Sequence, residues 1–275
     1  MTSKNGLHFR DIRTWGPKPK YDRVRKFEKV DNDFIKIAGP CSVENKHQIW
    51  KMAKIVSELG ANYLRGGVFR AGTYPGNNFG WVEEELIAHY HEAAEAFGLR
   101  NIIEVLDYTE DSLELISKYC SCYQIGARSM QNYTLLKRIA RSGKRIFLKR
   151  GTNATLDELL GSCEHLLING AKDIVIIERG GVTNLNHVRW DLSISMIPAV
   201  KALTQIPIIV DASHGTGRRD LVEPMILAGI AAGADGLLCE VHENPDYSFS
   251  DAEQAIEPIA YKNLMDKVNK IKSII

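Results

Sequence analysis

Residues 173–180 read DIVIIERG, a short run of apolar and β-branched residues that ends in a glutamate, an arginine and a glycine. Comparable runs recur along the chain, and most are apolar without interruption in the middle, as expected for parallel strands that are buried on both faces. We therefore predict eight strands, over residues 34–40, 62–67, 101–106, 122–127, 145–151, 173–180, 207–214 and 236–242.

Amphipathic helical patterns lie between the predicted strands. Residues 83–97 carry apolar side chains on one face and stop before Gly98. Residues 155–169 begin with Thr155 and Glu158, which form a capping-box pair. Further patterns of the same kind begin at Thr109 and cover residues 131–142, 191–204, 217–232 and 253–273.

Strands that alternate with helices predict an α/β protein with a single (β/α)8 TIM barrel over residues 34–275. Residues 1–33 are polar and contain Pro17 and Pro19. We expect them to be a short N-terminal extension with a strand or hairpin that caps the barrel. A doubly wound open sheet is the alternative, and it is weaker because the chain has no glycine fingerprint for nucleotide binding.

The composition argues against several classes of function. The 35 Lys and Arg residues are matched by 34 Asp and Glu, so no overall field draws the chain to nucleic acid or to a membrane surface. The N-terminus lacks the apolar segment of a secretory signal, and no apolar run is long enough to cross a bilayer. Five scattered cysteines make an odd number, which argues against a disulfide framework and predicts a reduced, cytoplasmic protein.

Polar side chains follow the apolar part of the predicted strands. Buried charge is costly unless it is paired or liganded, and the carboxyl ends of barrel strands form the face on which active sites are built. This pattern favours an enzyme. Four cations at these ends would repel one another without a bound anion, and guanidinium groups suit carboxylate and phosphate. A small ligand that carries both groups, such as phosphoenolpyruvate, would satisfy Arg65, Arg128, Lys149 and Arg179.

A second group of residues has the chemistry of a metal site. Cys41, His214 and Glu240 follow the first, seventh and eighth predicted strands, which become neighbours when the barrel closes. With Asp251 from the last loop they offer a thiol, an imidazole and two carboxylates to a divalent metal. Taken singly, the cysteine is as easily a small core residue and the histidine a packed or capping residue. The grouping favours the metal.

Several longer segments resemble one family. IAGPCSVEN, YLRGGVFR, QIGARSMQN, FLKRG, IVDASHGTGRRDLV and CEVHENPDYSFSDAEQAI, in this order, are similar to the 3-deoxy-D-arabino-heptulosonate 7-phosphate (DAHP) synthases. The pattern resembles the short type I branch, which is related to the 3-deoxy-octulosonate 8-phosphate synthases. The resemblance covers residues 34–258, nearly the whole predicted barrel.

The resemblance implies an activity and a role for each of these residues. In such enzymes C3 of phosphoenolpyruvate attacks an aldose phosphate, water adds at C2, and phosphate leaves to give a 3-deoxy-2-keto sugar acid for aromatic amino acid biosynthesis. The implied divalent metal (Mn, Co, Fe or Zn) is bound by Cys41, His214, Glu240 and Asp251. The implied phosphoenolpyruvate site consists of Arg65, Glu104, Arg128, Lys149 and Arg179. Catalysis is implied for Lys149, Arg65 and His214, in a cytoplasmic homodimer or homotetramer.

One loop departs from the family. After the second strand the family usually has Lys-Pro-Arg followed by Thr or Ser, which binds the aldose and its phosphate, whereas this chain has Arg70-Ala71-Gly72-Thr73. Arginine differs from lysine in reach and donor geometry, and Gly72 carries no charge. Either erythrose 4-phosphate is bound in another way, with Arg70, Thr73 and Arg218 as candidates, or the acceptor is a different aldose.

Two further functions are compatible with parts of the sequence. An octulosonate-phosphate synthase would use arabinose 5-phosphate, but the Lys-Ala-Asn-Arg-Ser loop usual in that branch is missing. A non-catalytic barrel that serves as a binding subunit would not need the complete metal and phosphoenolpyruvate sets.

Overall fold

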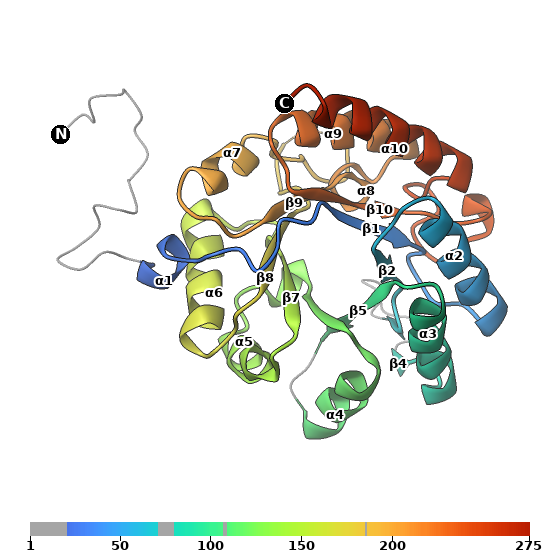
Figure 1. Cartoon of the computed structure of the whole chain (residues 1–275), viewed down its shortest axis with the longest axis horizontal. Coiled ribbons are helices and arrows are strands. Elements are labelled where there is room, and N and C mark those ends of the chain that lie inside the picture. Colours follow the sequence, from blue (N-terminus) through green and yellow to red (C-terminus); the bar gives the residue numbers. More distant parts are fainter. Residues whose placement is uncertain (1–20, 71–79, 107–108, 185) are drawn as a thin grey trace.

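The computed structural model describes residues 21–70, 80–106, 109–184 and 186–275. These residues form a closed barrel of eight parallel strands inside a ring of helices, which confirms the predicted TIM barrel (Figure 1). The strands follow one another around the barrel in chain order. β1 (Ile35–Gly39) closes the ring by pairing with β10 (Gly236–Glu240) along its whole length.

All eight predicted strands are present, with ends that differ by a few residues from the prediction. A small antiparallel pair outside the barrel, β3 (Phe69–Arg70) and β4 (Gly80–Trp81), is additional. The barrel strands between β1 and β10 are β2 (Tyr63–Arg65), β5 (Arg100–Val105), β6 (Cys122–Ile125), β7 (Arg145–Lys149), β8 (Ile174–Glu178) and β9 (Ile208–Asp211).

The barrel wall is buried on both sides, which explains the continuous apolar runs in the sequence. One apolar cluster fills the interior and includes Ile37, Tyr63 and Phe147, the last two with ring centroids 5.2 Å apart. Residues next to these in sequence, such as Leu64 and Leu148, pack outward against the helices. Because neighbours along a strand point to opposite sides, every strand contributes to both layers.

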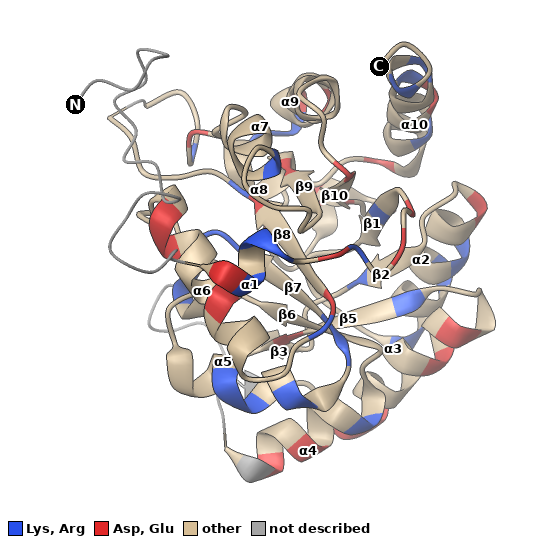
Figure 2. Cartoon of the chain, turned by 60° about the vertical axis from the view of Figure 1, so that its left-hand side comes forward, with Lys and Arg blue, Asp and Glu red and all other residues tan. Residues whose placement is uncertain are grey.

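Most outer helices lie where the sequence patterns predicted them, whereas α2 (Lys46–Glu58), between β1 and β2, was not predicted. α6 (Leu156–Ile168) begins with the predicted capping box, in which the hydroxyl of Thr155 accepts from the backbone N–H of Glu158 at 3.2 Å. None of the described helices is long and apolar enough to cross a membrane. In the view of Figure 2, basic and acidic segments are interspersed on the outer helices. The other long helices are α2 (Lys46–Glu58), α3 (Glu84–Ala96), α4 (Glu110–Tyr119), α5 (Tyr133–Ile139), α9 (Arg219–Ala231) and α10 (Pro258–Lys272).

The N-terminal extension differs from the prediction where it is described. The expected strand or hairpin is wrong for α1 (Asp22–Arg25), which is a single helical turn. The carboxylate of Glu164 on α6 accepts from the backbone N–H groups of Arg23 at 3.2 Å and Val24 at 2.9 Å. These bonds satisfy N–H groups that a helix start leaves free, and they hold the turn against α6. Residues 1–20 lie outside the described residues.

Several helices begin later than predicted, and the last of them, α10 (Pro258–Lys272), starts five residues after the predicted residue 253. The segment before α7 (Met196–Lys201) is held as a loop by paired backbone hydrogen bonds between Gly181 and Asp191, both 2.9 Å long. The pattern over 217–232 is preceded by a separate short helix, α8 (Ala212–Thr216), which ends at Gly217. Gly217 has a φ of +66°, a left-handed conformation that breaks the helix at little cost for glycine.

The amino-terminal end of the barrel is closed by a buried arginine. The guanidinium of Arg145 donates to Asp173 at 2.7 Å, to Asp31 at 2.6 Å and to the hydroxyl of Tyr63 at 2.5 Å. The Arg145 side chain is 4% exposed. The guanidinium of Arg100 also lies over the Tyr63 ring, 4.6 Å from its centroid. Every one of these contacts lies at the end of the barrel opposite to the strand carboxyl ends.

We predict that Arg145→Leu lowers the free energy of unfolding by on the order of 3 kcal/mol, because it leaves the half-buried carboxylates of Asp31 and Asp173 and the buried Tyr63 hydroxyl without their partner. Chemical denaturation with paired measurements of kcat/KM tests this. The stability should fall while kcat/KM at a permissive temperature stays near wild type. The control is Lys118→Met, which breaks an exposed pair with Glu84 on the outer helices and should change stability by less than about 1 kcal/mol. An unchanged stability in Arg145→Leu would contradict the assignment.

Candidate active site

The site forms one step beyond the apolar interior of the barrel. Inward-facing positions on a strand are two residues apart, so the residue two positions after the last apolar interior side chain also faces the barrel axis. At the carboxyl ends of seven of the eight strands these positions are polar, whereas β1 has Gly39 there. We call them the polar layer, which consists of Arg65, Glu104, Gln124, Lys149, Arg179, Asp211 and Glu240.

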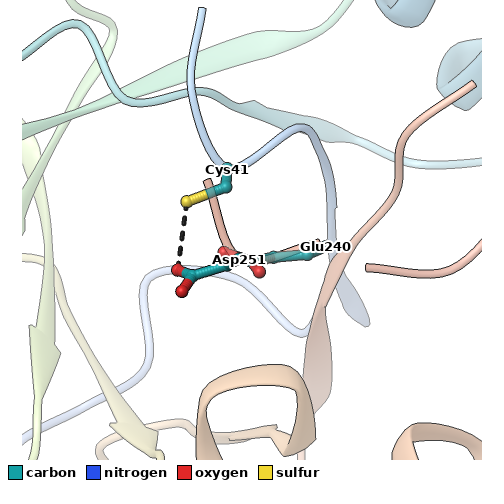
Figure 3. A group of neighbouring side chains, drawn as sticks. All are labelled: Cys41, Glu240 and Asp251. Atoms are coloured by element: carbon teal, nitrogen blue, oxygen red, sulfur yellow. Dashed lines mark hydrogen bonds between the residues drawn. The ribbon is translucent and has the colours of Figure 1, made fainter. Parts of the chain in front are cut away.

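Three of the four predicted metal ligands lie within reach of one ion. One ligand atom from each of Cys41, Glu240 and Asp251 lies within 4.8 Å of the others (Figure 3). The Sγ–H of Cys41 donates to Oδ2 of Asp251 at 3.2 Å. Asp251 has a φ of +53°, a left-handed conformation that is uncommon outside glycine and that directs its carboxylate to this group.

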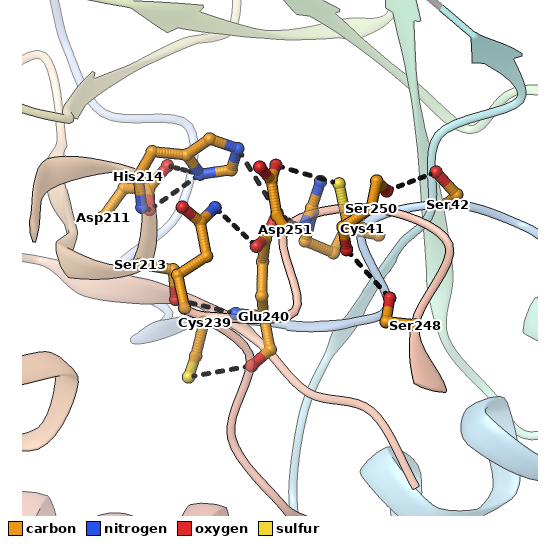
Figure 4. Close-up of polar contacts among 12 residues, drawn as sticks. Cys41, Ser42, Asp211, Ser213, His214, Cys239, Glu240, Ser248, Ser250 and Asp251 are labelled. Atoms are coloured by element: carbon orange, nitrogen blue, oxygen red, sulfur yellow. Dashed lines mark hydrogen bonds and ion pairs between the residues drawn. The ribbon is translucent and has the colours of Figure 1, made fainter. Parts of the chain in front are cut away.

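The fourth predicted ligand, His214, lies beside the other three. It is in α8, immediately after β9, and its Nε2 is 3.3 Å from Oε1 of Glu240. Its Nδ1 is 2.8 Å from Oδ2 of Asp211 on the other side of the ring (Figure 4). The structure thus brings together all four residues, from the β1, β9 and β10 ends and the last loop.

The protonation of this group depends on its burial. Burial, and then the charge of Glu240, raises the pKa of the Cys41 thiol well above its ordinary value. Burial also acts to raise the pKa of Asp251, but His214, the hydrogen bond from Cys41 and the charge of Arg189 outweigh it and lower that pKa. The thiol therefore stays protonated, and its S–H forms a hydrogen bond to the ionised Asp251 carboxylate. A divalent cation would replace this proton, because the thiolate is the ligand form of cysteine.

The donor set fits a first-row divalent metal. A sulfur, an imidazole nitrogen and carboxylate oxygens at this spacing match the mixed ligands that Mn²⁺, Fe²⁺, Co²⁺ and Zn²⁺ accept. Glu240 is held for such a role by two further contacts, an ion pair with Arg65 and a hydrogen bond of 2.6 Å from the side chain of Gln254. Both partners are buried, so the carboxylate has little freedom to turn away.

The cations of the polar layer surround the same end of the barrel. Arg65, Lys149 and Arg179 are each less than a tenth exposed. The ammonium of Lys149 lies 3.3 Å from Oδ2 of Asp211. Arg179 packs over the Trp190 ring at 5.2 Å, and its buried Nη1 has no acceptor among the described residues. Burial lowers the pKa of Arg179. A buried donor of this kind is costly unless a ligand supplies the acceptor.

The remaining predicted phosphoenolpyruvate residues lie at the β5 and β6 ends. Glu104 accepts a hydrogen bond of 3.0 Å from the side chain of Gln124. Gly126 permits this position of Glu104, because a Cβ on Gly126 would lie 2.1 Å from Oε1 of Glu104. Arg128 follows in a short 3₁₀ turn and is exposed, so it is free to reach a ligand from the mouth of the barrel.

Residues outside the predicted set also contribute to the site. Asp211 is fully buried between His214 and Lys149, and Gln254 holds Glu240. Arg189 places Nη1 3.2 Å from Oδ1 of Asp251. Asp211 lies two residues past Ile209, a relation that points to the site only once the structure shows Ile209 facing inward, whereas Arg189 comes from a loop with no periodic signal.

Another buried acidic residue, Glu178, also ends a barrel strand, β8, but it is not part of the polar layer. It is fully buried and binds Arg150 with two contacts, from Nε at 2.5 Å and from Nη2 at 2.9 Å. Because Arg150 and Glu178 are sequence neighbours of Lys149 and Arg179, they face the opposite side of the wall. This pair supports the strand ends from behind.

The predicted aldose residues are the least defined part of the site. Arg70 ends strand β3, and the structure does not describe its side chain. Thr73, with Ala71 and Gly72, lies outside the described residues. Arg218 is exposed, and its guanidinium donates to Asp220 at 2.6 Å and to the carbonyl of His187 at 3.1 Å. The donors of Arg218 are thus already engaged within the protein, which does not favour aldose binding by this residue. Its role in binding the aldose stays a prediction.

Comparison with known proteins extends over the whole barrel. Residues 25–275 match the DAHP synthetase I family. The chain is 38% identical over 244 residues to phospho-2-dehydro-3-deoxyheptonate aldolase of Thermotoga maritima, a match that covers 88% of this chain and 71% of that protein. It is 25% identical over 260 residues to 2-dehydro-3-deoxyphosphooctonate aldolase of Desulfotalea psychrophila, covering 87% of this chain and 90% of that protein.

Solved structures agree with the sequence matches. The crystal structure of the Thermotoga maritima aldolase, a DAHP synthase, has a TM-score of 0.84 to this chain at 36% identity, covering 89% of this chain and 71% of that one. A truncated form of 3-deoxy-D-arabino-heptulosonate 7-phosphate synthase from the same organism has a TM-score of 0.80 at 36% identity, covering 89% and 88%. The family match spans all the strand ends that build the site. The chain therefore belongs to the DAHP synthetase I family.

Proposed function

We propose that this chain is a DAHP synthase, which condenses phosphoenolpyruvate with erythrose 4-phosphate and releases phosphate. The observation that carries the proposal is the position of Glu240, whose carboxylate contacts both halves of the site. We call Arg65, Lys149 and Arg179 the cation group, and Cys41, His214, Glu240 and Asp251 the ligand set. Glu240 forms an ion pair with Arg65 of the cation group and lies 3.3 Å from Nε2 of His214 in the ligand set. An anion on the cations and an aldehyde at the ligand set would therefore lie next to each other, as a condensation requires.

The cations of the polar layer would bind phosphoenolpyruvate. Arg65 at the end of β2 and Lys149 at the end of β7 are buried, and Arg179 offers a buried donor with no acceptor among the described residues. Arg128 would close on the ligand from the exposed side. Guanidinium and ammonium groups in a site of low water content hold phosphate and carboxylate strongly, and they need little reorganisation as charge moves.

The condensation follows from this placement. C3 of phosphoenolpyruvate forms a bond to the aldehyde carbon, water adds at C2, and the phosphate leaves so that C2 becomes a ketone. Arg65 and Lys149 would hold the phosphate while it gains charge on departure. The chain's own ligand set, Cys41, His214, Glu240 and Asp251, would hold a divalent cation, which supplies Lewis-acid polarisation of the aldehyde oxygen when bound.

The identity of the acceptor rests on the loop at residues 70–73. We propose erythrose 4-phosphate, in line with the Thermotoga maritima relative, and we propose that Arg70 and Thr73 contact it. A specialised enzyme with a different aldose is the second candidate, because Gly72 stands where the family usually has an arginine. Arabinose 5-phosphate is a third acceptor to test, given the similarity to the Desulfotalea psychrophila aldolase.

We predict that exhaustive chelation abolishes phosphate release from phosphoenolpyruvate and erythrose 4-phosphate, and that Mn²⁺ or Co²⁺ restores it. His214→Ala should not be rescued by either ion, because it lacks one of the ligands. The control is His47→Ala, an exposed histidine on α2, which should behave like the wild type. Full activity in protein shown to be free of metal would refute the metal requirement.

We predict that Lys149→Ala or Arg128→Ala lowers kcat/KM for phosphoenolpyruvate by more than about a hundredfold, which corresponds to a loss of about 3 kcal/mol of transition-state stabilisation. Each change removes a charge-assisted contact to the bound anion. Arg128 is exposed, so its variant should keep the wild-type Tm. Lys149 is buried and paired with Asp211, so its Tm must be measured alongside the kinetics. Lys201→Ala, at the opposite end of the barrel, is the matched control. Wild-type kinetics in both test variants would contradict the assignment of Lys149 and Arg128 to phosphoenolpyruvate binding.

We predict that Arg70→Lys, Ala71→Pro and Gly72→Arg together raise the preference for erythrose 4-phosphate over non-phosphorylated aldoses by about tenfold, because they restore a charged contact to the phosphate. A panel of aldoses, with phosphate release as the signal, measures the preference for both proteins. Efficient use of erythrose 4-phosphate by the wild type, with no gain in the triple variant, would show that the loop change is neutral.

A further inference from the structure

A single buried carboxylate lies between the ligand set and the cation group. Asp211 ends β9 and is fully buried. Its Oδ2 is 2.8 Å from Nδ1 of His214 and 3.3 Å from Nζ of Lys149. Its Oδ1 accepts from the backbone N–H of His214 at 3.1 Å. Asp211 is not among the clustered ligand atoms of Cys41, Glu240 and Asp251. It contacts His214 of the ligand set (Figure 4) and Lys149 of the cation group.

The contact with His214 decides which ring nitrogen is available. A histidine that donates Nδ1–H to a carboxylate presents Nε2 as a lone pair, with the ring held in one orientation. Here Nε2 faces Glu240 at 3.3 Å, toward Cys41 and Asp251. Asp211 therefore holds His214 in the form and the direction that a bound cation needs.

The contact of Asp211 with Lys149 fixes the position of an ammonium group in the cation group. The Lys149 side chain is 6% exposed and its ammonium has Asp211 as its anionic partner among the described residues. A lysine stem is flexible, so this ion pair fixes where the ammonium stands before a ligand enters. It also balances the positive charge that Arg65, Lys149 and Arg179 gather in one layer.

We propose that Asp211 is a positioning residue that holds the metal-ligand His214 and the anion-binding Lys149 together, so that both halves of the site are aligned by one carboxylate. This inference rests on the proposed function, since it assigns Asp211 a role in the same site. A purely structural role is the competing explanation, because Asp211 is also the N-cap residue of α8.

Asp211→Asn separates the two explanations. Asparagine is as good an N-cap as aspartate, so the hydrogen bond to the His214 backbone and the helix start are kept. The negative charge is lost, and with it the charge-assisted hydrogen bond from the His214 ring and the ion pair with Lys149. The matched control is Asp235→Asn, which removes a largely buried charge paired with Lys29 and Lys201 at the opposite end of the barrel and keeps an acceptor for the Ile208 backbone N–H.

The first measurement is the affinity of the chelated protein for Co²⁺, followed by its visible absorption bands. We expect Asp211→Asn to bind Co²⁺ about 10- to 100-fold more weakly than the wild type, and Asp235→Asn to bind it as the wild type does. Equal weakening in both variants would assign the effect to lost stability. A wild type that binds no Co²⁺ would refute the proposed metal-dependent function itself, whereas equal affinity in wild type and Asp211→Asn would refute this inference alone.

The second measurement is kcat/KM for phosphoenolpyruvate at saturating Co²⁺. With the metal site filled, we still expect a loss of about tenfold or more in Asp211→Asn, because Lys149 has lost its anchor. Full recovery under these conditions would show that Asp211 serves His214 alone and would overturn the bridging role.

A third measurement does not depend on the variant folding. In wild-type protein loaded with Zn²⁺ and labelled with ¹⁵N at histidine, long-range proton–nitrogen correlations report the protonated ring nitrogen. We expect His214 to carry its proton on Nδ1 and to bind the ion through Nε2. A proton on Nε2 would contradict the arrangement proposed for Asp211.

Discussion

The structure depends on one geometric constraint, the two-residue alternation of eight parallel strands closed into a barrel. The alternation fills the interior with apolar side chains and then places a polar residue at the next inward position of nearly every strand. Charged groups buried this closely are stable when opposite charges touch. Glu240 and Asp211 provide that contact, each between a cation and His214. The ligand set and the anion cradle are therefore two parts of one balanced layer.

Support for this layer comes from the residues that alternate with it. Arg150 and Glu178 follow or precede the cradle cations in sequence, so they point outward and pair beneath the helices. Glu178 also accepts from the backbone N–H of Gly180 at 2.9 Å, at the start of the loop that carries Arg189 and Trp190. A buried pair outside the barrel interior thus holds the loop whose side chains contact Asp251 and Arg179. Its contribution is to geometry, since neither member of the pair faces the ligand.

The two ends of the barrel divide the work between stability and chemistry. At the amino-terminal end Arg145 is bonded to Asp31, Asp173 and Tyr63, and its donors are used within the protein. At the carboxyl end Arg179 keeps a buried donor without an acceptor among the described residues. The arginine donors at the amino-terminal end are therefore satisfied within the protein, whereas one arginine donor at the carboxyl end is not. This contrast is what a binding site requires, because a ligand gains most where the protein has left a buried polar group unsatisfied.

The sequence by itself determined the barrel, because its eight apolar runs alternate with amphipathic helix patterns in the order that a (β/α)8 fold needs. Its motifs also indicated the nine residues proposed for the metal and phosphoenolpyruvate sites. Asp211 was missed because a strand that is apolar on both faces does not reveal which of its residues point inward. Only the tertiary structure decided that Arg65 and Glu240, 175 positions apart, share one ion pair and that Glu178 turns away to Arg150. Such contacts depend on the register of the closed barrel, which local propensity and spacing do not encode.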